Sequence, residues 1–375
     1  MAEFDFLMVG SGIAGASAAA LLSAEARVVL VERESAHGYH TTGRSAALYS
    51  ASYGNAAVRA LTLASRPFFD APPEGFAEHP LLTPRGCLHI ARPDQLDKVQ
   101  ALYDACVTSG VRVEMVDAAR AGAFCPVLKP GYVAQAAYEP DAMDIDVDAL
   151  HQGFLRMFRT NGGTVRLDAG VTGLARANGA WTARLAGGET LTAKVVIDAA
   201  GAWADEVAGM AGASPLGLRP LRRTAVLLDV PSGVESRGWP AVIDADEQFY
   251  FKPEAGRILA SPADETPSEP CDAYPDAMDV AICVDRVQQA ADIPVRRIGQ
   301  SWAGLRTFAR DRSLVIGYDP RVEDFFWLAG QGGYGVQTAP AAARVAAALA
   351  TRRGLTEDVR AFGLEAQVLS PGRFG

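Results

Sequence analysis

The chain opens with an alternation of apolar runs and small residues. Phe6 to Val9 and Val28 to Val31 are uninterrupted apolar runs, as in strands buried on both faces of a parallel sheet. The segment between them, from Ile13 to about Ala24, is rich in alanine and leucine, which favours a helix. The pattern therefore predicts a strand, a helix and a second strand at the start of the chain.

Three glycines mark the turn between the first predicted strand and the helix. Gly10, Gly12 and Gly15 have the spacing G-x-G-x-x-G, which permits a tight turn, a close approach of pyrophosphate to the backbone, and close packing of helix on sheet. Glu32 ends the second strand, where a carboxylate can bind ribose hydroxyls. The sequence predicts a dinucleotide site, because an ordinary glycine-rich turn would leave Glu32 unexplained.

Further elements follow in blocks that leave this unit and return to it. The expected strands are 87–91, 112–115, 134–138, 164–167, 171–176, 194–198, 222–228, 248–251, 257–260 and 325–329. The expected helices are 43–50, 56–69, 95–108, 118–124, 146–159, 276–291 and 336–350. Thr41 or Thr42 can cap the helix expected at 43–50.

This order of elements predicts an α/β fold with two domains. The expected Rossmann-like nucleotide-binding domain is discontinuous and comprises residues 1–80, 142–215 and 302–375. The expected substrate-binding domain is a mixed β-sheet unit comprising residues 81–141 and 216–301.

Composition excludes some classes of partner. Hydrophobic residues make up 49% of the chain and charged residues 21%, as in folded globular proteins. The net charge of −9 argues against a nucleic-acid partner. No C-x-x-C pair occurs among the five cysteines, so we expect neither a metal site nor a disulfide framework. We expect a cytoplasmic protein without a signal peptide or a membrane span of about 18 apolar residues. Peripheral contact with the inner membrane face is compatible with this sequence.

Five motifs carry a family resemblance that covers most of the chain. They are G-S-G-I-A-G followed by Glu32, T-G-R-S-A from Thr42, V-V-I-D-A-A-G-A-W from Val195, W-A-G-L-R from Trp302, and G-Q-G-G-Y-G-V-Q-T from Gly330. In this order they resemble the D-amino-acid oxidase superfamily. The sequence is most similar to bacterial FAD-dependent D-amino-acid dehydrogenases of the D-arginine dehydrogenase type. The resemblance implies non-covalently bound FAD, with the mixed sheet above the flavin.

The same resemblance implies a set of cofactor contacts. The residues implied to bind FAD are Gly10, Gly12, Ala14, Gly15, Glu32, Arg33, Thr41, Thr42, Gly43, Arg44, Ser45, Ala46, Leu48, Val171, Gly201, Gly304, Gly332, Gly333, Tyr334, Gly335, Val336, Gln337 and Thr338. Glu32 and Arg33 are implied to flank the adenosine ribose. Residues 332–338 are implied to begin a helix that faces the flavin pyrimidine, where a helix N-terminus stabilises negative charge.

The substrate implied by the resemblance is an amino acid held by its carboxylate. Arg222 and Arg306 stand where carboxylate-binding residues are implied, with Tyr53 and Tyr250 as hydroxyl donors, so these four are the candidate catalytic residues. A guanidinium fork gives the firmest grip on a carboxylate. Arg223 remains an alternative to Arg222.

The histidines bear on the mechanism, and the residues expected in the pocket bear on specificity. No histidine has a recognisable partner in the sequence, so we expect the bound amine to be neutral and its lone pair to drive the Cα hydride to the flavin. The imino acid would hydrolyse to a 2-oxo acid and ammonia. Cys87 and Leu48 make the expected pocket less polar, which predicts uncharged, hydrophobic D-amino acids and little activity on D-arginine or D-lysine. The remaining substrate-binding candidates are Glu247, Gly304 and Gln337.

Three other functions fit parts of this pattern. A 2-hydroxy acid or a secondary amine such as sarcosine or proline could use the same arginine grip. A catalytically silent flavoprotein subunit would need the fold alone. An NAD dehydrogenase would share the glycine motif. The electron acceptor, quinone or oxygen, is left open by the sequence.

Overall fold

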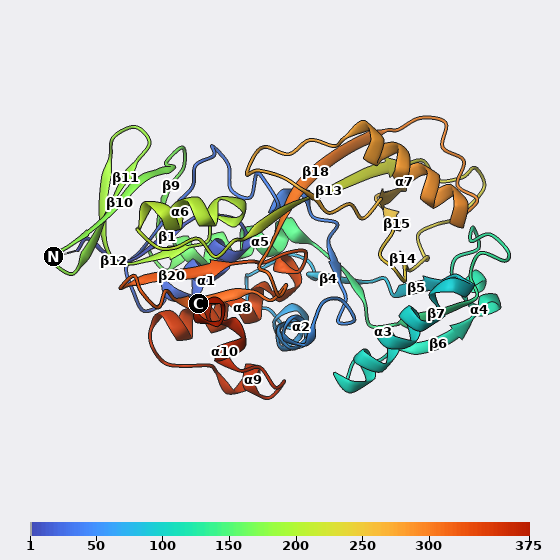
Figure 1. The fold of residues 1–375 in the computed structure, drawn as a ribbon, viewed down its shortest axis with the longest axis horizontal. Coiled ribbons are helices and arrows are strands. Elements are labelled where there is room, and N and C mark those ends of the chain that lie inside the picture. Colours follow the sequence, from blue (N-terminus) through green and yellow to red (C-terminus); the bar gives the residue numbers. More distant parts are fainter. Residues whose placement is uncertain (1) are drawn as a thin grey trace.

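The computed structural model describes residues 2–375, whose strands form two large sheets and one small one (Figure 1). The first sheet contains, in spatial order, β10 (Val171–Ala177), β11 (Ala180–Leu185), β12 (Thr190–Asp198), β1 (Phe4–Val9), β2 (Val28–Val31) and β9 (Thr164–Arg166), with β20 (Phe325–Ala329) beside β12 and β19 (Val315–Tyr318) beside β20. The second sheet contains β17 (Thr266–Pro267), β13 (Arg219–Leu228), β16 (Arg257–Ser261), β15 (Tyr250–Glu254), β14 (Ala241–Asp244), β5 (Cys87–Ala91), β7 (Gln135–Glu139) and β6 (Glu114–Asp117), with β18 (Gln300–Phe308) beside β13. The small sheet has the order β3 (Leu48–Tyr49), β8 (Met143–Ile145) and β4 (Leu82–Pro84).

Helices cover both large sheets. They are α1 (Ile13–Leu22), α2 (Ala56–Asp70), α3 (Leu96–Thr108), α4 (Ala118–Phe124), α5 (Val147–Thr160), α6 (Ala204–Met210), α7 (Ala277–Ala290), α8 (Gly335–Ala350), α9 (Glu357–Arg360) and α10 (Ala366–Leu369). Within the described chain, no helix combines the length and the apolar character that crossing a bilayer requires.

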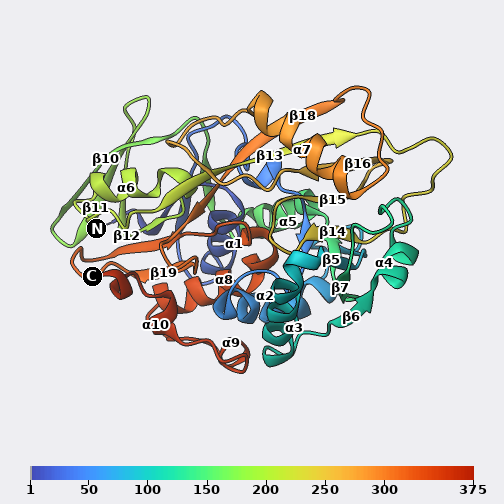
Figure 2. The ribbon, with the colours of Figure 1, turned by 45° about the vertical axis from the view of Figure 1, so that its right-hand side comes forward.

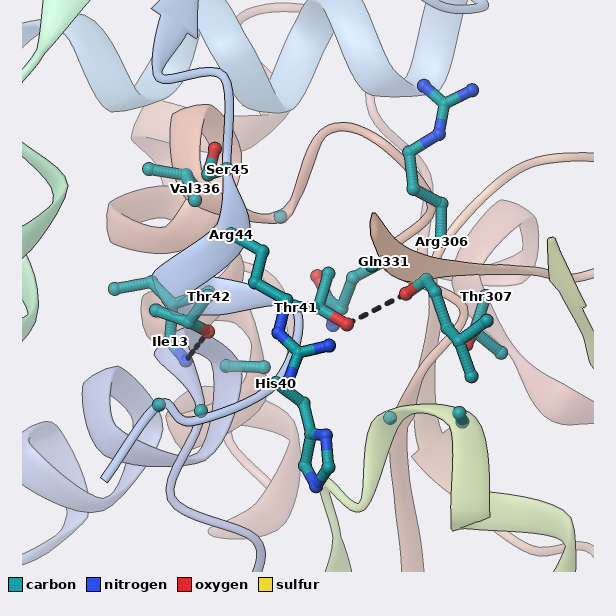
Figure 3. A pocket seen from close by; sticks show the side chains of 18 of the residues that line it. Ile13, His40, Thr41, Thr42, Arg44, Ser45, Arg306, Thr307, Gln331 and Val336 are labelled. Atoms are coloured by element: carbon teal, nitrogen blue, oxygen red, sulfur yellow. Dashed lines mark hydrogen bonds between the residues drawn. The ribbon is translucent and has the colours of Figure 1, made fainter. Parts of the chain in front are cut away.

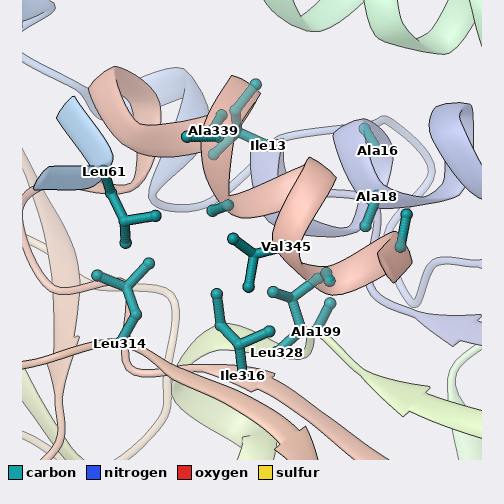
Figure 4. Packing of buried hydrophobic residues seen from close by; sticks show 14 of the residues in the cluster. Ile13, Ala16, Ala18, Leu61, Ala199, Leu314, Ile316, Leu328, Ala339 and Val345 are labelled. Carbon is teal, nitrogen blue, oxygen red and sulfur yellow. The ribbon is translucent and has the colours of Figure 1, made fainter. Parts of the chain in front are cut away.

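The first sheet packs against α1 and α8 through small residues. Ala16 and Ala18 of α1 and Ala339 and Val345 of α8 are all buried, and Figure 4 shows Ala339 beside Ile13 of α1 and Val345 above Ile316 of β19. Alanine on both helices lets the two backbones approach closely, so the helix N-termini can point at a common space. The parallel pairing of β1 with β2 and β12 brings the glycine-rich turn to the same edge.

The second sheet lies at the opposite end of the molecule (Figures 1 and 2). Its β13 and β16 are covered by α7, whose Cys283 and Val287 are buried in the same hydrophobic cluster as Val226. Asp276 caps α7 by accepting a hydrogen bond from the backbone N–H of Met278. This sheet thus has its own core, separate from that of the first sheet.

The expected α/β fold class is confirmed, and most expected elements occur within a few residues of their predicted positions. The helix expected at 43–50 is wrong. This segment forms a short 3-10 turn at Thr42–Arg44 and then strand β3. Thr42 caps a different helix, because its hydroxyl accepts a hydrogen bond from Ile13 N–H of α1 at 3.0 Å. Residues 302–306, expected to return to the nucleotide-binding domain, instead belong to β18 of the second sheet.

Candidate functional site

A cavity of about 620 Å³ lies between the two large sheets. Its walls come from the glycine-rich turn before α1, the segment 38–48, the start of α8, and strands β13, β15 and β18. The cavity is long enough to pass from Val171 at one end to Tyr250 at the other. Segments far apart in the sequence therefore share one elongated site.

Two helices begin at this cavity. The N-cap residues are Gly12 for α1 and Tyr334 for α8, and neither caps its helix with its own side chain. In the part of the chain that the structure describes, the first turn of each of these two helices has no acidic residue. Apart from the Ile13 N–H, which donates to Thr42, their first N–H groups and their partial positive charges are therefore available to an anion. Figure 3 shows Thr42 beside the first N–H of α1 and Val336 on α8 nearby.

Glu32 lines the end of the cavity next to the glycine-rich turn, which we call the nucleotide end. Its side chain is 9% exposed and accepts hydrogen bonds from Ser11 N–H at 2.9 Å, the Ser11 hydroxyl at 2.7 Å and Glu34 N–H at 3.1 Å. Arg33 lies over the ring of Trp203 at 4.7 Å from its centroid. These contacts fix the carboxylate and the neighbouring cation where a ribose and an adenine could bind.

Strand register decides which arginines face the cavity at the other end. In the antiparallel pair of β13 with β18, Leu221 lies opposite Arg306 and Arg223 opposite Gly304. Paired residues share a face and successive residues alternate, so Arg223 and Arg306 lie on one face. Arg222 lies on the other face, where it donates to Asp279 at 2.7 Å. The expected pairing of Arg222 with Arg306 at one site is therefore corrected to Arg223 with Arg306.

Arg306 is held firmly. It is 11% exposed and donates from Nη1 to the Tyr53 hydroxyl at 2.6 Å and from Nη2 to Glu265 at 2.9 Å. Its guanidinium carbon also lies 5.4 Å from the centroid of the Phe308 ring. Arg223 is 10% exposed and donates from Nε to the backbone oxygen of Asp264 at 2.8 Å. Both guanidinium groups are thus positioned before any ligand binds.

Burial shifts the titration of several groups around the cavity. Desolvation raises the pKa of Tyr53, of Tyr250 and of Glu247, so the two phenols stay protonated. Desolvation lowers the pKa of His89 to about 4. A neutral imidazole therefore lines the cavity, 2.9 Å from the Ser52 hydroxyl, which donates to the buried Glu139 at 2.6 Å.

Most residues expected at the site do line the cavity. The lining includes Gly10, Gly12, Ala14, Glu32, Arg33, Thr41, Thr42, Arg44, Ser45, Ala46, Leu48, Tyr53, Val171, Gly201, Glu247, Tyr250, Gly304, Arg306, Gly332, Gly333, Gly335, Val336 and Gln337. The lining excludes Gly15, Gly43, Cys87, Arg222, Tyr334 and Thr338.

The excluded residues have other positions for physical reasons. Cys87 is fully buried beneath His89, with its sulfur 3.5 Å from the imidazole, so it cannot form the expected pocket wall. A Cβ on Gly15 would lie 1.9 Å from the Gly10 oxygen, so this glycine serves packing of helix on turn. Tyr334 and Thr338 are buried at the start of α8.

Some lining residues were missed by the sequence analysis. His89 and Lys252 both face the cavity, and Lys252 donates to Asp144 at 2.9 Å. A signal existed for His89, because it is two residues from Cys87 and alternation in a strand puts both on one face. Lys252 gave no such signal, since a lysine in a strand is usually solvated.

The fold and the cavity define a two-sheet protein with a dinucleotide site at one end and a guanidinium pair at the other. The family model described as FAD dependent oxidoreductase matches residues 5–349, and the chain belongs to this family. FAD is therefore its cofactor, as the sequence predicted. The starts of α1 and α8 at the cavity, the glycine turn and Glu32 fit such a dinucleotide.

Three similar proteins illustrate the family. A curated FAD-dependent oxidoreductase domain-containing protein 1 from Xenopus laevis is 29% identical over 185 residues, which cover 43% of this chain and 35% of the relative. This match thus spans about a third of the relative's length. Glycine oxidase from Geobacillus kaustophilus has a TM-score of 0.84 at 22% identity, covering 96% of this chain and 98% of its own. L-alpha-glycerophosphate oxidase from Mycoplasma pneumoniae, with FAD bound, has a TM-score of 0.83 at 18% identity, covering 93% and 94%.

Proposed function

We propose that this protein oxidises a D-amino acid with an uncharged, mainly hydrophobic side chain to the imino acid, which water converts to a 2-oxo acid and ammonia. The observation that carries the proposal is the pair Arg223 and Arg306 on one face of the β13–β18 ladder, beside the start of α8. Two positioned guanidinium groups match the geometry of one carboxylate.

The grip on the carboxylate would fix the α-carbon. Arg306 is held by Tyr53 and Arg223 by the backbone of Asp264, so little side-chain freedom would be lost on binding. Tyr250 lines the same space and, with a raised pKa, can donate its hydroxyl hydrogen to the substrate. FAD, when bound, supplies the acceptor for the α-hydrogen and its electron pair. The N–H groups at the start of α8 would stabilise the negative charge that develops.

The titratable residues around the cavity affect whether the substrate amine binds in its protonated or its neutral form. Tyr53 and Tyr250 have raised pKa values, and His89, whose pKa is lowered to about 4, is uncharged between pH 5 and 8 but hydrogen-bonded to Ser52. These groups favour binding of an amine that has already lost its proton to solvent. The proposed reaction therefore uses the substrate's lone pair, with residues of the chain orienting it.

The side-chain specificity rests on the walls beside the arginines. Leu48, Ala225, Ala241 and Ile243 line this part of the cavity and are apolar. Lys252 is paired with Asp144 and Glu254, so neither of these carboxylates is free to bind a cationic side chain such as that of D-arginine. Glu247, with a pKa raised by burial, favours the neutral acid. This supports uncharged substrates.

The cofactor contacts belong to the same proposal. Glu32 and Arg33 would bind the adenosine ribose, and Ala14 would lie at the pyrophosphate. The segment 41–48, Gly304 and the start of α8 would surround the flavin ring. Gln337 would stay fixed, because its amide donates to Ser50 O at 3.1 Å and to Thr62 at 2.8 Å.

A second function is favoured by one comparison. The similar glycerophosphate oxidase is named for a substrate that carries hydroxyl groups. A 2-hydroxy acid, or a secondary amine such as sarcosine or proline, would use the same two arginines. The carboxylate grip does not distinguish these substrates from a D-amino acid.

The experiment that tests the proposal is anaerobic mixing of the purified flavoprotein with a substrate panel while the flavin absorbance is followed. The panel comprises D- and L-amino acids, 2-hydroxy acids, sarcosine and proline. We expect the fastest bleaching with apolar D-amino acids. Fastest reduction by D-arginine would contradict the specificity, and no reduction by any compound would favour a catalytically silent flavoprotein. Adding oxygen or a quinone to the reduced protein identifies the electron acceptor.

A further inference from the structure

A carboxylate of the chain itself already occupies the guanidinium pair. Glu265 Oε1 accepts from Arg306 Nη2 at 2.9 Å and lies 3.4 Å from Arg223 Nη2. A third guanidinium holds the same group in a fork, since Arg312 donates to Oε1 at 2.7 Å and to Oε2 at 3.0 Å. Glu265 does not line the cavity, but it pairs with the same two guanidinium groups that the proposed substrate carboxylate would use.

The backbone around Glu265 is fixed on both sides. Asp264 accepts hydrogen bonds from Thr224 N–H at 2.6 Å and the Thr224 hydroxyl at 3.0 Å. Thr266 pairs with Arg222 in the β17–β13 ladder. Glu265 can therefore leave the arginine pair by rotation of its side chain, while the loop that carries it stays in place.

The backbone conformation and the packing of Arg312 accompany its contact with Glu265. Its φ of 62° lies in the left-handed region, which favours glycine. Its guanidinium carbon packs 4.0 Å from the centroid of the Phe308 ring, the same ring that Arg306 contacts. A long, charged residue in this conformation is held by its contacts with Glu265 and Phe308.

We propose that Glu265 is a resident competitor for the substrate's carboxylate: the substrate displaces it from Arg223 and Arg306, and Arg312 holds it in both states. This inference rests on the proposed function and extends it. Glu265 sets how tightly a carboxylate binds and excludes weakly bound anions from the flavin. Arg312 lowers the cost of displacement, because the released carboxylate keeps a charged partner.

The test uses acetate as the probe and the flavin-loaded protein. Its dissociation constant is measured from the perturbation of the flavin spectrum and, independently, by calorimetry. Glu265→Gln removes the competing charge and is expected to lower the acetate dissociation constant at least tenfold. Arg312→Gln leaves Glu265 on the pair alone and is expected to raise it at least threefold. The double variant should behave like Glu265→Gln. The matched control is Glu269→Gln, which removes the same charge from an exposed site just beyond β17 and should change nothing.

Each result decides a different claim. An acetate dissociation constant that is unchanged or higher in Glu265→Gln would overturn the competition, because it would make Glu265 a support for the arginines. Equal effects of Glu265→Gln and Glu269→Gln would also overturn it. Arg306→Met tests the proposed function separately: if acetate binding survives this substitution, the carboxylate grip itself fails, whatever Glu265 does.

Discussion

Backbone atoms form one end of the cavity, and charged side chains form the other. The nucleotide end consists of glycines, alanines and helix N-termini, so the backbone makes the site and Glu32 is its principal charged group. The substrate end contains the long charged side chains Arg223 and Arg306, whose charges are balanced by Glu265 beside the cavity. The first end recognises a ligand by close approach, and the second by charge and hydrogen-bond direction.

This difference predicts how each end responds to substitution. A site made of backbone has no tolerance for an added atom, because the atoms that would clash cannot rotate away. A site made of side chains tolerates changes of shape but depends on charge, because buried ions need their partners. Substitutions that add an atom and substitutions that remove a charge should therefore have opposite effects in rank at the two ends.

The largest effect is expected at Gly15. A methyl group there would lie 1.9 Å from the Gly10 oxygen, so Gly15→Ala must displace the glycine-rich turn, where the pyrophosphate is proposed to bind. We expect little or no flavin in the purified variant, measured by the ratio of flavin to protein absorbance. The control is Gly122→Ala, because Gly122 is also helical but has open space around it. This control should gain about 0.5–1 kcal/mol in free energy of unfolding. Normal flavin content in Gly15→Ala would contradict the close-packing argument.

The next effect compares two arginines that are close in the fold but on opposite faces. A guanidinium–carboxylate pair at about 4 Å, with an effective dielectric constant near 20, is worth about 4 kcal/mol. Arg306→Met should therefore lower kcat/KM roughly a thousandfold, with the flavin content unchanged. Arg222→Met removes an ion pair with Asp279 outside the cavity, so kcat/KM should fall by less than about threefold. Steady-state kinetics on the best panel substrate measures both, and equal losses would overturn the corrected assignment.

The same contrast explains what could be predicted from the sequence. The nucleotide end was predictable because a tight turn and a close approach require glycine at fixed spacing, and Gly10, Gly12 and Glu32 all line the cavity. The fold class followed from the apolar runs at β1, β2 and β20, whose predicted bounds overlap those observed. These signals are local, so they survive in a single sequence.

The substrate end could not be predicted to the same extent because it depends on strand register. Arg222 and Arg223 are adjacent in sequence, and only the pairing of β13 with β18 decides which one faces the cavity. Glu265 reaches the arginines from the loop just before β17, which no periodicity marked. The helix expected at 43–50 failed for a similar reason, since Thr42 caps α1 through a contact between segments far apart in the chain.

A third, smaller effect concerns His89 and pH. Burial lowers the pKa of His89 from 6.5 to about 4, so the folded state stays neutral while the unfolded chain takes up a proton below pH 6.5. Its contribution to stability is therefore complete above pH 6.5 and is lost as the pH falls toward 4, by about 3 kcal/mol in total. His89→Gln should flatten this part of the stability curve, measured by chemical denaturation at several pH values. The control His79→Gln alters an exposed histidine and should keep the wild-type slope.

The smallest effect tests the charged side chain at the backbone-built end. Arg33 lines the cavity beside Glu32, and its guanidinium carbon lies 4.7 Å from the centroid of the Trp203 ring. Its side chain is half exposed, so a cation–π contact of this kind contributes about 0.5–1 kcal/mol. Because Trp203 also lines the cavity, loss of this contact frees its ring, and Arg33→Ala should raise the FAD dissociation constant by at most about two- to fivefold, measured by flavin fluorescence on rebinding to the apoprotein. Arg27→Ala removes an equally exposed arginine at the far end of β2 and should leave the constant unchanged. A rise of more than tenfold in the FAD dissociation constant of Arg33→Ala would mean that charge, as well as backbone, determines binding at the nucleotide end. The contrast between the two ends would then be one of degree.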